Sequence, residues 1–195
     1  LRRGLLVLAL CLPALVPLFL VELPRSADGR AHLFRVVLMA EHLRAGEWWP
    51  RYSPELVYGF GYPLFNYYAP LTYYAGALLH LLGLNAILAL HVLMALTVLV
   101  GAGGVYVLAQ EWFANKWSGA LAVAVYVFAP YSLFNLYPRA AVPEALAVAL
   151  LPWLWWSARR ALLSPTALAL IRLALLYAAL LLTHNLTAII GTALL

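Results

Sequence analysis

Charged residues and cysteine are scarce in this sequence, and each scarcity excludes a class of protein. Only 10% of its 195 residues are charged and 66% are hydrophobic, whereas soluble domains are about half apolar and about a quarter charged. The composition excludes an ordinary soluble domain and indicates an integral membrane protein. The single cysteine, Cys11, excludes a disulfide within the chain. The net charge of +5 is interpreted as a signal of orientation in the lipid bilayer, and no nucleic-acid partner is expected.

Hydrophobic runs long enough for membrane spans recur along the chain, so the expected fold is all-α, a polytopic bundle of transmembrane helices. The sequence begins with Leu1 and ends inside an apolar run, so we expect an N-terminal fragment of a longer protein. The first run lacks a small-residue cleavage site and is expected to remain as a helix. The predicted spans are residues 5–21, 86–109, 118–131 and 143–157, then 167–195, which holds a fifth span and room for the start of a sixth.

One apolar run, Leu71 to Leu84, allows two topologies. If it crosses the membrane, Arg139 and Glu144 lie on the side opposite Asp28. If it lies in the interface, at the end of a long external loop over residues 22–85, these three residues and His184 share the external face. We favour the second topology, because it also satisfies the positive-inside rule for short loops. It places on the cytoplasmic side Arg2, Arg3, Lys116, Arg159 and Arg160.

Within that loop, interfacial helices are predicted at 28–45 and 66–84. Ser26 is the expected N-cap of the first, and Gly46 its expected stop. At about 100° per residue, one stripe of this helix carries Asp28, His32, Arg35, Met39 and His42, and the far side carries Leu33, Phe34, Val37 and Leu38. The stripe is either a solvated face of a helix resting on the membrane or the wall of a site. Asp28 and His32, four residues apart, could also ligate a divalent metal ion.

Aromatic residues crowd the glycine- and proline-rich segment that follows. Trp49, Tyr62, Tyr67 and Tyr68 are the rings of interest there. Such rings suit either a belt at headgroup depth or stacking against a sugar.

Two further places carry polar groups between apolar runs. Arg139 and Glu144 either pair with each other, as charges at membrane depth usually do, or leave Arg139 to bind a phosphate. His184 is either a helix-end residue or another group of the site.

Four strings, in order, carry a resemblance to a known family. They are Asp28-xxx-His32-xx-Arg35, Gly46-xxx-Pro50-Arg51, Gly59-Phe60-Gly61-Tyr62-Pro63-Leu64-Phe65-Asn66-Tyr67-Tyr68-Ala69-Pro70 and Tyr137-Pro138-Arg139-Ala140-xxx-Glu144-Ala145-Leu146-Ala147. Over nearly the whole chain, the sequence resembles the bacterial membrane family labelled "6-pyruvoyl-tetrahydropterin synthase-related". The membrane region of that family is similar to the N-terminal half of GT-C glycosyltransferases, the class that includes protein O-mannosyltransferases, aminoarabinose transferases and oligosaccharyltransferases.

The resemblance implies a GT-C-like bundle in a bacterial plasma membrane that transfers a sugar from a polyprenyl-phosphate donor on the extracytoplasmic face. It implies that Asp28 is the catalytic base or a metal ligand, and we expect His32 to assist it. The residues expected to bind the donor and its phosphate are Arg35, Arg139, Glu144 and His184. Many relatives carry an acidic pair where Arg139 and Glu144 stand, so a required metal ion is not expected.

Two other classes of function stay open. A transporter or flippase for lipid-linked intermediates would line its path with Asp28, Arg139 and Glu144, and it predicts inverted repeats and interrupted helices. A non-catalytic membrane scaffold would use the same residues only to satisfy one another.

Overall fold

The structure is a computed structural model that describes residues 2–20, 22, 25–113, 115 and 117–195. Lys116, one of the predicted cytoplasmic charges, lies outside these residues, as does Val21 at the end of the first predicted span. The described residues form helices joined by loops, with one isolated β-bridge between Ser53 and Tyr62 and no strand. The predicted all-α class is therefore confirmed.

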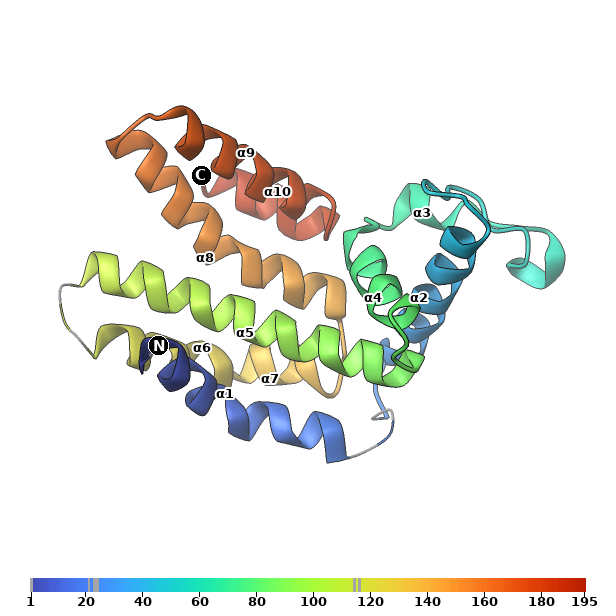
Figure 1. Cartoon of the computed structure of the whole chain (residues 1–195), viewed down its shortest axis with the longest axis horizontal. Coiled ribbons are helices and arrows are strands. Elements are labelled where there is room, and N and C mark those ends of the chain that lie inside the picture. Colours follow the sequence, from blue (N-terminus) through green and yellow to red (C-terminus); the bar gives the residue numbers. More distant parts are fainter. Residues whose placement is uncertain (1, 21, 23–24, 114, 116) are drawn as a thin grey trace.

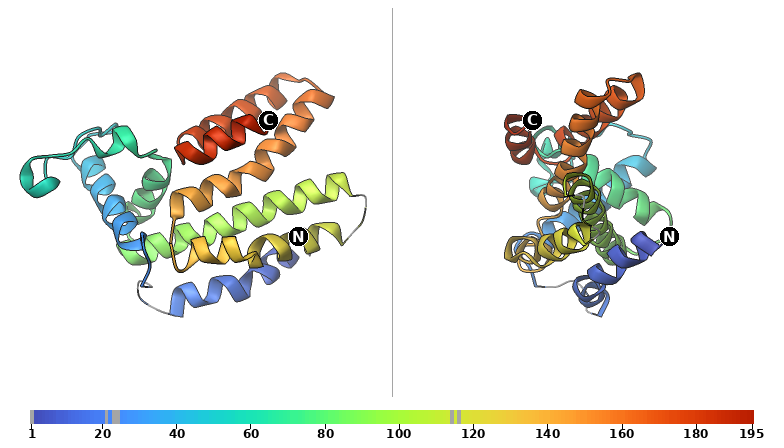
Figure 2. Two further views of the ribbon diagram at one scale, coloured as in Figure 1. Left: turned by 180° about the vertical axis from the view of Figure 1, so that it is seen from behind. Right: turned by 90° about the vertical axis from the view of Figure 1, so that its left-hand side faces the viewer.

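Long helices form the larger part of the molecule and lie side by side (Figures 1 and 2). The long helices are α1 (Arg2–Leu20), α5 (Ala86–Trp112) and α8 (Val142–Leu163), and the shorter α6 (Ser118–Phe128) and α7 (Pro130–Leu136) pack with them. Helix α5 contacts α1, α6 and α8 and so forms the centre of this group. Helices α9 (Ala167–Leu181) and α10 (Asn185–Ala193) pack on the outer side of α8.

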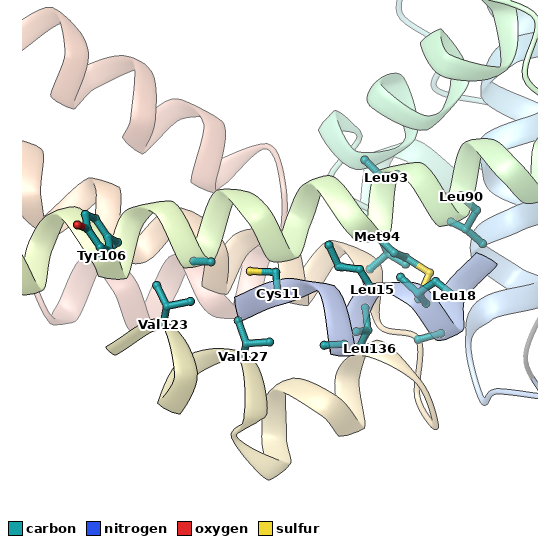
Figure 3. Packing of buried hydrophobic residues seen from close by; sticks show 14 residues of the cluster. Cys11, Leu15, Leu18, Leu90, Leu93, Met94, Tyr106, Val123, Val127 and Leu136 are labelled. Carbon is teal, nitrogen blue, oxygen red and sulfur yellow. The ribbon is translucent and has the colours of Figure 1, made fainter. Parts of the chain in front are cut away.

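The core between α1, α5 and α6–α7 is built from apolar side chains. Cys11, Leu18, Met94 and Val123 belong to one buried cluster, which Figure 3 shows along α5.

Close approach of α5 and α8 depends on a glycine of α5. A Cβ atom at Gly104 would lie 2.9 Å from the Trp153 ring on α8. Small residues at such crossings allow the tight van der Waals packing that holds membrane helices together.

The predicted span 118–131 covers α6 and only the start of α7, and the structure continues the helical segment to Leu136 as two helices bent by 52°. The break falls at Ala129 and Pro130. Proline has no backbone N–H to continue the helical ladder, and its ring clashes with the preceding turn, so a sharp bend at this position is expected.

Two other predicted segments are also divided. Residues 66–84 form α3 (Leu64–Tyr67) and α4 (Leu71–Leu81), separated at Pro70, and residues 167–195 form α9 and α10, separated near His184. At about 1.5 Å per residue, the 11 residues of α4 extend about 16 Å. That is about half the hydrocarbon thickness of a bilayer, so α4 is too short to cross it alone.

Among the described helices, two are long and apolar enough to cross a membrane, Arg3–Leu20 and Ala86–Trp112, and the bent pair α6–α7 makes three if it counts as one span. This is fewer than the sequence predicted. Helix α8 has 22 residues, but its prolines, tryptophans and end charges make it less apolar. Helix α9 is apolar but has only 15 residues.

A smaller group of elements lies across one end of the long helices (Figure 1). It comprises α2 (Gly29–Arg44), the 3₁₀ turn Val57–Gly59, α3 and α4. Helix α2 packs on α4, where a Cβ at Gly76 would come within 2.6 Å of Val36. The segment between α2 and α3 projects away from the long helices in Figure 1 and in the left view of Figure 2.

Candidate functional site

A polar pocket of about 340 Å³ lies where the smaller group meets the ends of α7, α8, α9 and α10. Its walls come from four stretches of chain that are far apart in sequence. The residues that line it are Asp28, Ala31, His32, Arg35, Tyr67, Tyr68, Ala69, Arg139, Ala141, Pro143, Glu144, Thr183, His184, Asn185 and Leu186. All the predicted catalytic and phosphate-binding residues are among them, together with two of the four predicted aromatic residues.

The N-terminus of α2 differs from the prediction, because Asp28 and not Ser26 is the N-cap. The backbone N–H groups of Ala27 and Asp28 donate to the carbonyl oxygens of Pro138 and Arg139, at 3.0 and 2.9 Å. This pairing between distant segments accompanies an N-cap two residues later than the predicted one. The Asp28 side chain makes no capping bond, and it is 46% exposed at the pocket.

Arg139 connects the two carboxylates of the pocket. Its guanidinium lies 2.7 Å from the Glu144 carboxylate, and its Nε lies 3.7 Å from Asp28 Oδ2. Glu144, only 12% exposed, also accepts hydrogen bonds from Tyr131 and Asn135. The predicted pairing of Arg139 with Glu144 is therefore present, and Asp28 is the less engaged of the two acids.

The turn that presents Arg139 has a strained backbone. Ala140, next to it, has a φ of 53°, in the left-handed region that residues other than glycine seldom adopt. Ala140 is buried, and the N–H of Arg139 donates to Phe134 O at 3.0 Å. Strain of this kind persists only where the surrounding contacts determine the conformation, and it is frequent at functional sites.

A buried tyrosine of α4, Tyr73, contacts the polar side chains of α2. Tyr73 of α4 is 1% exposed, and its hydroxyl oxygen accepts from Arg35 Nη1 at 3.1 Å and lies 3.0 Å from His32 Nδ1. All three groups are satisfied if the Tyr73 hydroxyl donates to His32 Nδ1. The neutral imidazole then carries its proton on Nε2.

Burial, with the Arg35 guanidinium as the next cause, lowers the pKa of His32 to about 4. The imidazole is therefore neutral at pH 7. Burial also raises the pKa of Tyr73, so this hydroxyl stays protonated and able to donate. Sequence reasoning did not predict the contact of Tyr73 with His32 and Arg35, because its distance from α2 in the chain gives no sign of it.

Arg35 has a different environment from Arg139. Its guanidinium carbon lies 3.8 Å from the centre of the Tyr68 ring, a cation–π contact. Among the described residues, no carboxylate lies within ion-pair distance of Arg35. Arg35 therefore brings a positive charge to the pocket that the protein does not neutralise directly.

The predicted polar stripe of α2 is not a solvated face. His32, Met39 and His42 are buried, whereas Phe34 on the predicted apolar side is half exposed. Of the two predicted alternatives, the solvated face does not hold, because α4 covers part of this side of α2. Asp28, His32 and Arg35 of the stripe instead line the pocket.

His42 serves the projecting loop and not the pocket. Its Nδ1 lies 2.6 Å from Glu47 Oε2, and its Nε2 lies 2.9 Å from Ser53 Oγ. Ser53 is fully buried and pairs through its backbone with Tyr62. These bonds fasten the base of the loop to the end of α2.

The predicted aromatic residues divide into two groups. Tyr67 and Tyr68 line the pocket. Trp49 does not, and it stacks on Tyr74 with ring centres 6.3 Å apart. Tyr62 also lies outside the pocket, with its ring 6.1 Å from that of Tyr67.

His184 lines the pocket as the N-cap of α10. Its Nδ1 lies 2.9 Å from Thr187 Oγ1 and accepts from the Thr187 N–H at 3.4 Å. The helix-end role that was one of its predicted alternatives is therefore observed. Asn185 Nδ2 donates to Tyr67 O at 3.2 Å and holds α10 against the loop before α4.

Metal ligation by Asp28 and His32 was one of the alternatives left open by their spacing. Within the described part of the chain, no three His, Cys, Asp or Glu side chains lie close enough together to hold a metal ion. The pocket instead combines carboxylates, guanidinium groups, imidazoles and phenols.

A helical protein with membrane-spanning segments and a polar pocket at one end of its bundle is the class that these features define. The family model described as "6-pyruvoyl-tetrahydropterin synthase related domain; membrane protein" matches residues 65–195. The chain belongs to this family, and the predicted family is confirmed. The matched range includes Arg139, Glu144 and His184, but Asp28, His32 and Arg35 precede it. No curated protein and no solved structure matches the chain.

Proposed function

We propose that this protein transfers a sugar from a polyprenyl-phosphate donor to an acceptor, and that the polar pocket on the extracytoplasmic face is the site of transfer. The observation that carries the proposal is one pocket holding a partly exposed carboxylate, Asp28, together with two guanidinium groups, Arg35 and Arg139. A base and a cation that face the same space are what transfer from a phosphate carrier requires.

In the proposed reaction the acceptor oxygen bonds to the anomeric carbon of the sugar, and the bond between this carbon and the phosphate oxygen breaks. The proton of the acceptor hydroxyl passes to Asp28, and the electron pair of the broken bond stays on the polyprenyl phosphate. A carboxylate suits the role of base because it is ionised at neutral pH unless its environment is unusual.

Arg35 is the better candidate of the two arginines for the phosphate. The charge of Arg139 is shared between Glu144 and Asp28, whereas Arg35 forms no ion pair among the described residues and contacts the tyrosines Tyr68 and Tyr73. A guanidinium group can meet phosphate with two parallel hydrogen bonds. Neutral His32 would add a hydrogen bond from Nε2.

Asp28→Asn in the full-length protein tests the proposal. Asparagine is as good an N-cap as aspartate, so α2 should be retained while the base is lost. We expect the rate of transfer from labelled polyprenyl-phosphate sugars to fall by about 10²–10⁴. Glu55→Gln is the matched control, since Glu55 is exposed on the projecting loop, and it should leave the rate unchanged. Full transfer by Asp28→Asn would refute the assignment.

A second candidate, a flippase for lipid-linked intermediates, is favoured by the 52° break between α6 and α7. Discontinuous membrane helices are typical of transporter binding sites. Movement of a lipid-linked sugar across proteoliposomes without any transfer product would favour this candidate over the transferase.

A further inference from the structure

A second group of charged side chains lies at the opposite end of the long helices from the polar pocket. Helix α8 begins beside the pocket, with Pro143 and Glu144, and its last turns carry Arg159 and Arg160. Glu111, near the end of α5, accepts from Arg159 Nη1 at 2.5 Å and from Arg160 Nε at 3.0 Å. Both oxygens of this carboxylate are therefore engaged by arginines.

Trp156 connects this ion pair to a third arginine. Its Nε1 donates to Glu111 Oε2 at 2.7 Å, and its ring has the Arg160 guanidinium carbon 5.9 Å from its centre. The guanidinium carbon of Arg172, from α9, lies 4.3 Å from the same centre. Trp156 therefore contacts both arginines through its ring.

Arg172 has no acidic partner among the described residues. Its Nε donates to Ser157 Oγ at 3.1 Å, and none of the described ion pairs includes it. Three guanidinium groups and one carboxylate leave the cluster with two positive charges. An uncompensated cation in an apolar setting is costly, so a ligand that neutralises it is favoured.

The surroundings of Arg172 indicate what kind of ligand this is. On α9 it is flanked by Leu168, Ile171 and Leu175, all exposed, and it borders an open apolar surface with them. Arg172 is the sixth residue of α9, so its Cα lies only about 8 Å from the start of the helix. A long side chain at this depth can reach the headgroup level.

We propose that Arg172, with Arg159 and Arg160, binds the phosphate of an anionic phospholipid in the leaflet at this end of the bundle. The guanidinium of Arg172 is held by its cation–π contact with Trp156 and by its hydrogen bond to Ser157, and its planar fork suits a pair of phosphate oxygens. The exposed leucine and isoleucine side chains of α9 cover the upper acyl chains. Charge complementarity and the apolar surface together select an anionic lipid over free phosphate. This site is separate from the pocket and does not depend on the proposed transferase activity.

Lipid retention by the full-length protein tests the proposal. Purified protein is mixed with vesicles of equal phosphatidylglycerol and phosphatidylcholine, and the bound lipids are measured by mass spectrometry. The wild type should retain phosphatidylglycerol in excess, and Arg172→Gln should reduce that excess about five-fold, the effect of one charge near an anionic surface. Arg172→Lys should lose less than Arg172→Gln, because the charge remains.

Arg51→Gln is the matched control, since it removes the same charge from an exposed position on the projecting loop. Equal retention by wild type and Arg172→Gln, or an equal loss in Arg51→Gln, would overturn the proposal. If Arg172→Gln fails to fold, lipid retention by the wild type at increasing salt concentration is the test. The excess of phosphatidylglycerol that it retains must fall as salt is raised. An excess insensitive to salt, or abolished by inorganic phosphate at equal concentration, would also overturn it.

Discussion

Replacing Tyr73 with phenylalanine should destabilise the wall of the pocket more than the loss of one hydroxyl suggests. The Tyr73 hydroxyl lies between Arg35 Nη1 and His32 Nδ1, and both partners lose it together. The phenyl ring itself keeps its packing, including the contact with Phe65 at 5.8 Å. The substitution therefore removes hydrogen bonds without opening a cavity for the ring.

The magnitude follows from the burial of the partners. His32 is 6% exposed, and a buried group left without a partner costs about 1–3 kcal/mol. Arg35 is partly buried and can turn toward water, so its share is the smaller, about 0.5–1 kcal/mol. Together the free energy of unfolding should fall by about 1.5–4 kcal/mol.

Tyr74→Phe is the matched control in the same helix. Its hydroxyl donates to Trp48 O at an exposed position, where water can replace the protein, so we expect a loss of at most about 1 kcal/mol. Unfolding of the full-length protein in mixed detergent micelles, followed by circular dichroism, measures both. Equal losses in the two variants, or no loss in Tyr73→Phe, would refute the account of Tyr73 as the bridge between Arg35 and His32.

Two further predictions concern α2. Because burial, followed by the Arg35 charge, lowers the pKa of His32 to about 4, the stability tied to its neutral form is fully present above about pH 6.5 and is lost toward pH 4, by about 3 kcal/mol. Unfolding measured from pH 7 to 4 should therefore be less pH-dependent in His32→Gln, and identical pH profiles would contradict this. Gly76→Ala would bring a Cβ within 2.6 Å of Val36 Cγ2 and should cost about 1–3 kcal/mol. Gly4→Ala, with nothing within 4 Å, should not destabilise, and a similar loss there would show that crowding is not the cause.

Much of the helical framework could be predicted from the sequence, because long apolar runs bounded by glycine, proline or charge specify helices locally. The expected start of a helix at residue 86 agrees with the structure, and the expected end of another at residue 45 lies one residue beyond the observed end at Arg44. Charge also carried information about the pocket. If residues 71–84 do not cross the membrane, four polar residues are expected on one face of it: Asp28, Arg139, Glu144 and His184. The structure places all four in one pocket.

What could not be predicted depends on contacts between distant segments. The start of α2 is set by carbonyl oxygens of Pro138 and Arg139, not by the local preference that favoured Ser26 as a cap. Three residues of the α2 stripe, His32, Met39 and His42, are buried on a helix that packs against α4, a contact that the sequence did not indicate. Tyr73, Tyr131 and Asn135 acquire their partners only through packing, so no spacing in the sequence indicated them.

The backbone bonds from Ala27 and Asp28 to Pro138 and Arg139 also constrain how the protein is made. At roughly 5–20 residues per second, the ribosome needs roughly 6–22 seconds to reach Arg139 after synthesising Asp28. The walls from α9 and α10, which attach through Leu182 and Asn185, arrive later still. During biosynthesis α2 is therefore made before the segments it packs against are available. The pocket is complete only when the last of its four lining segments is inserted.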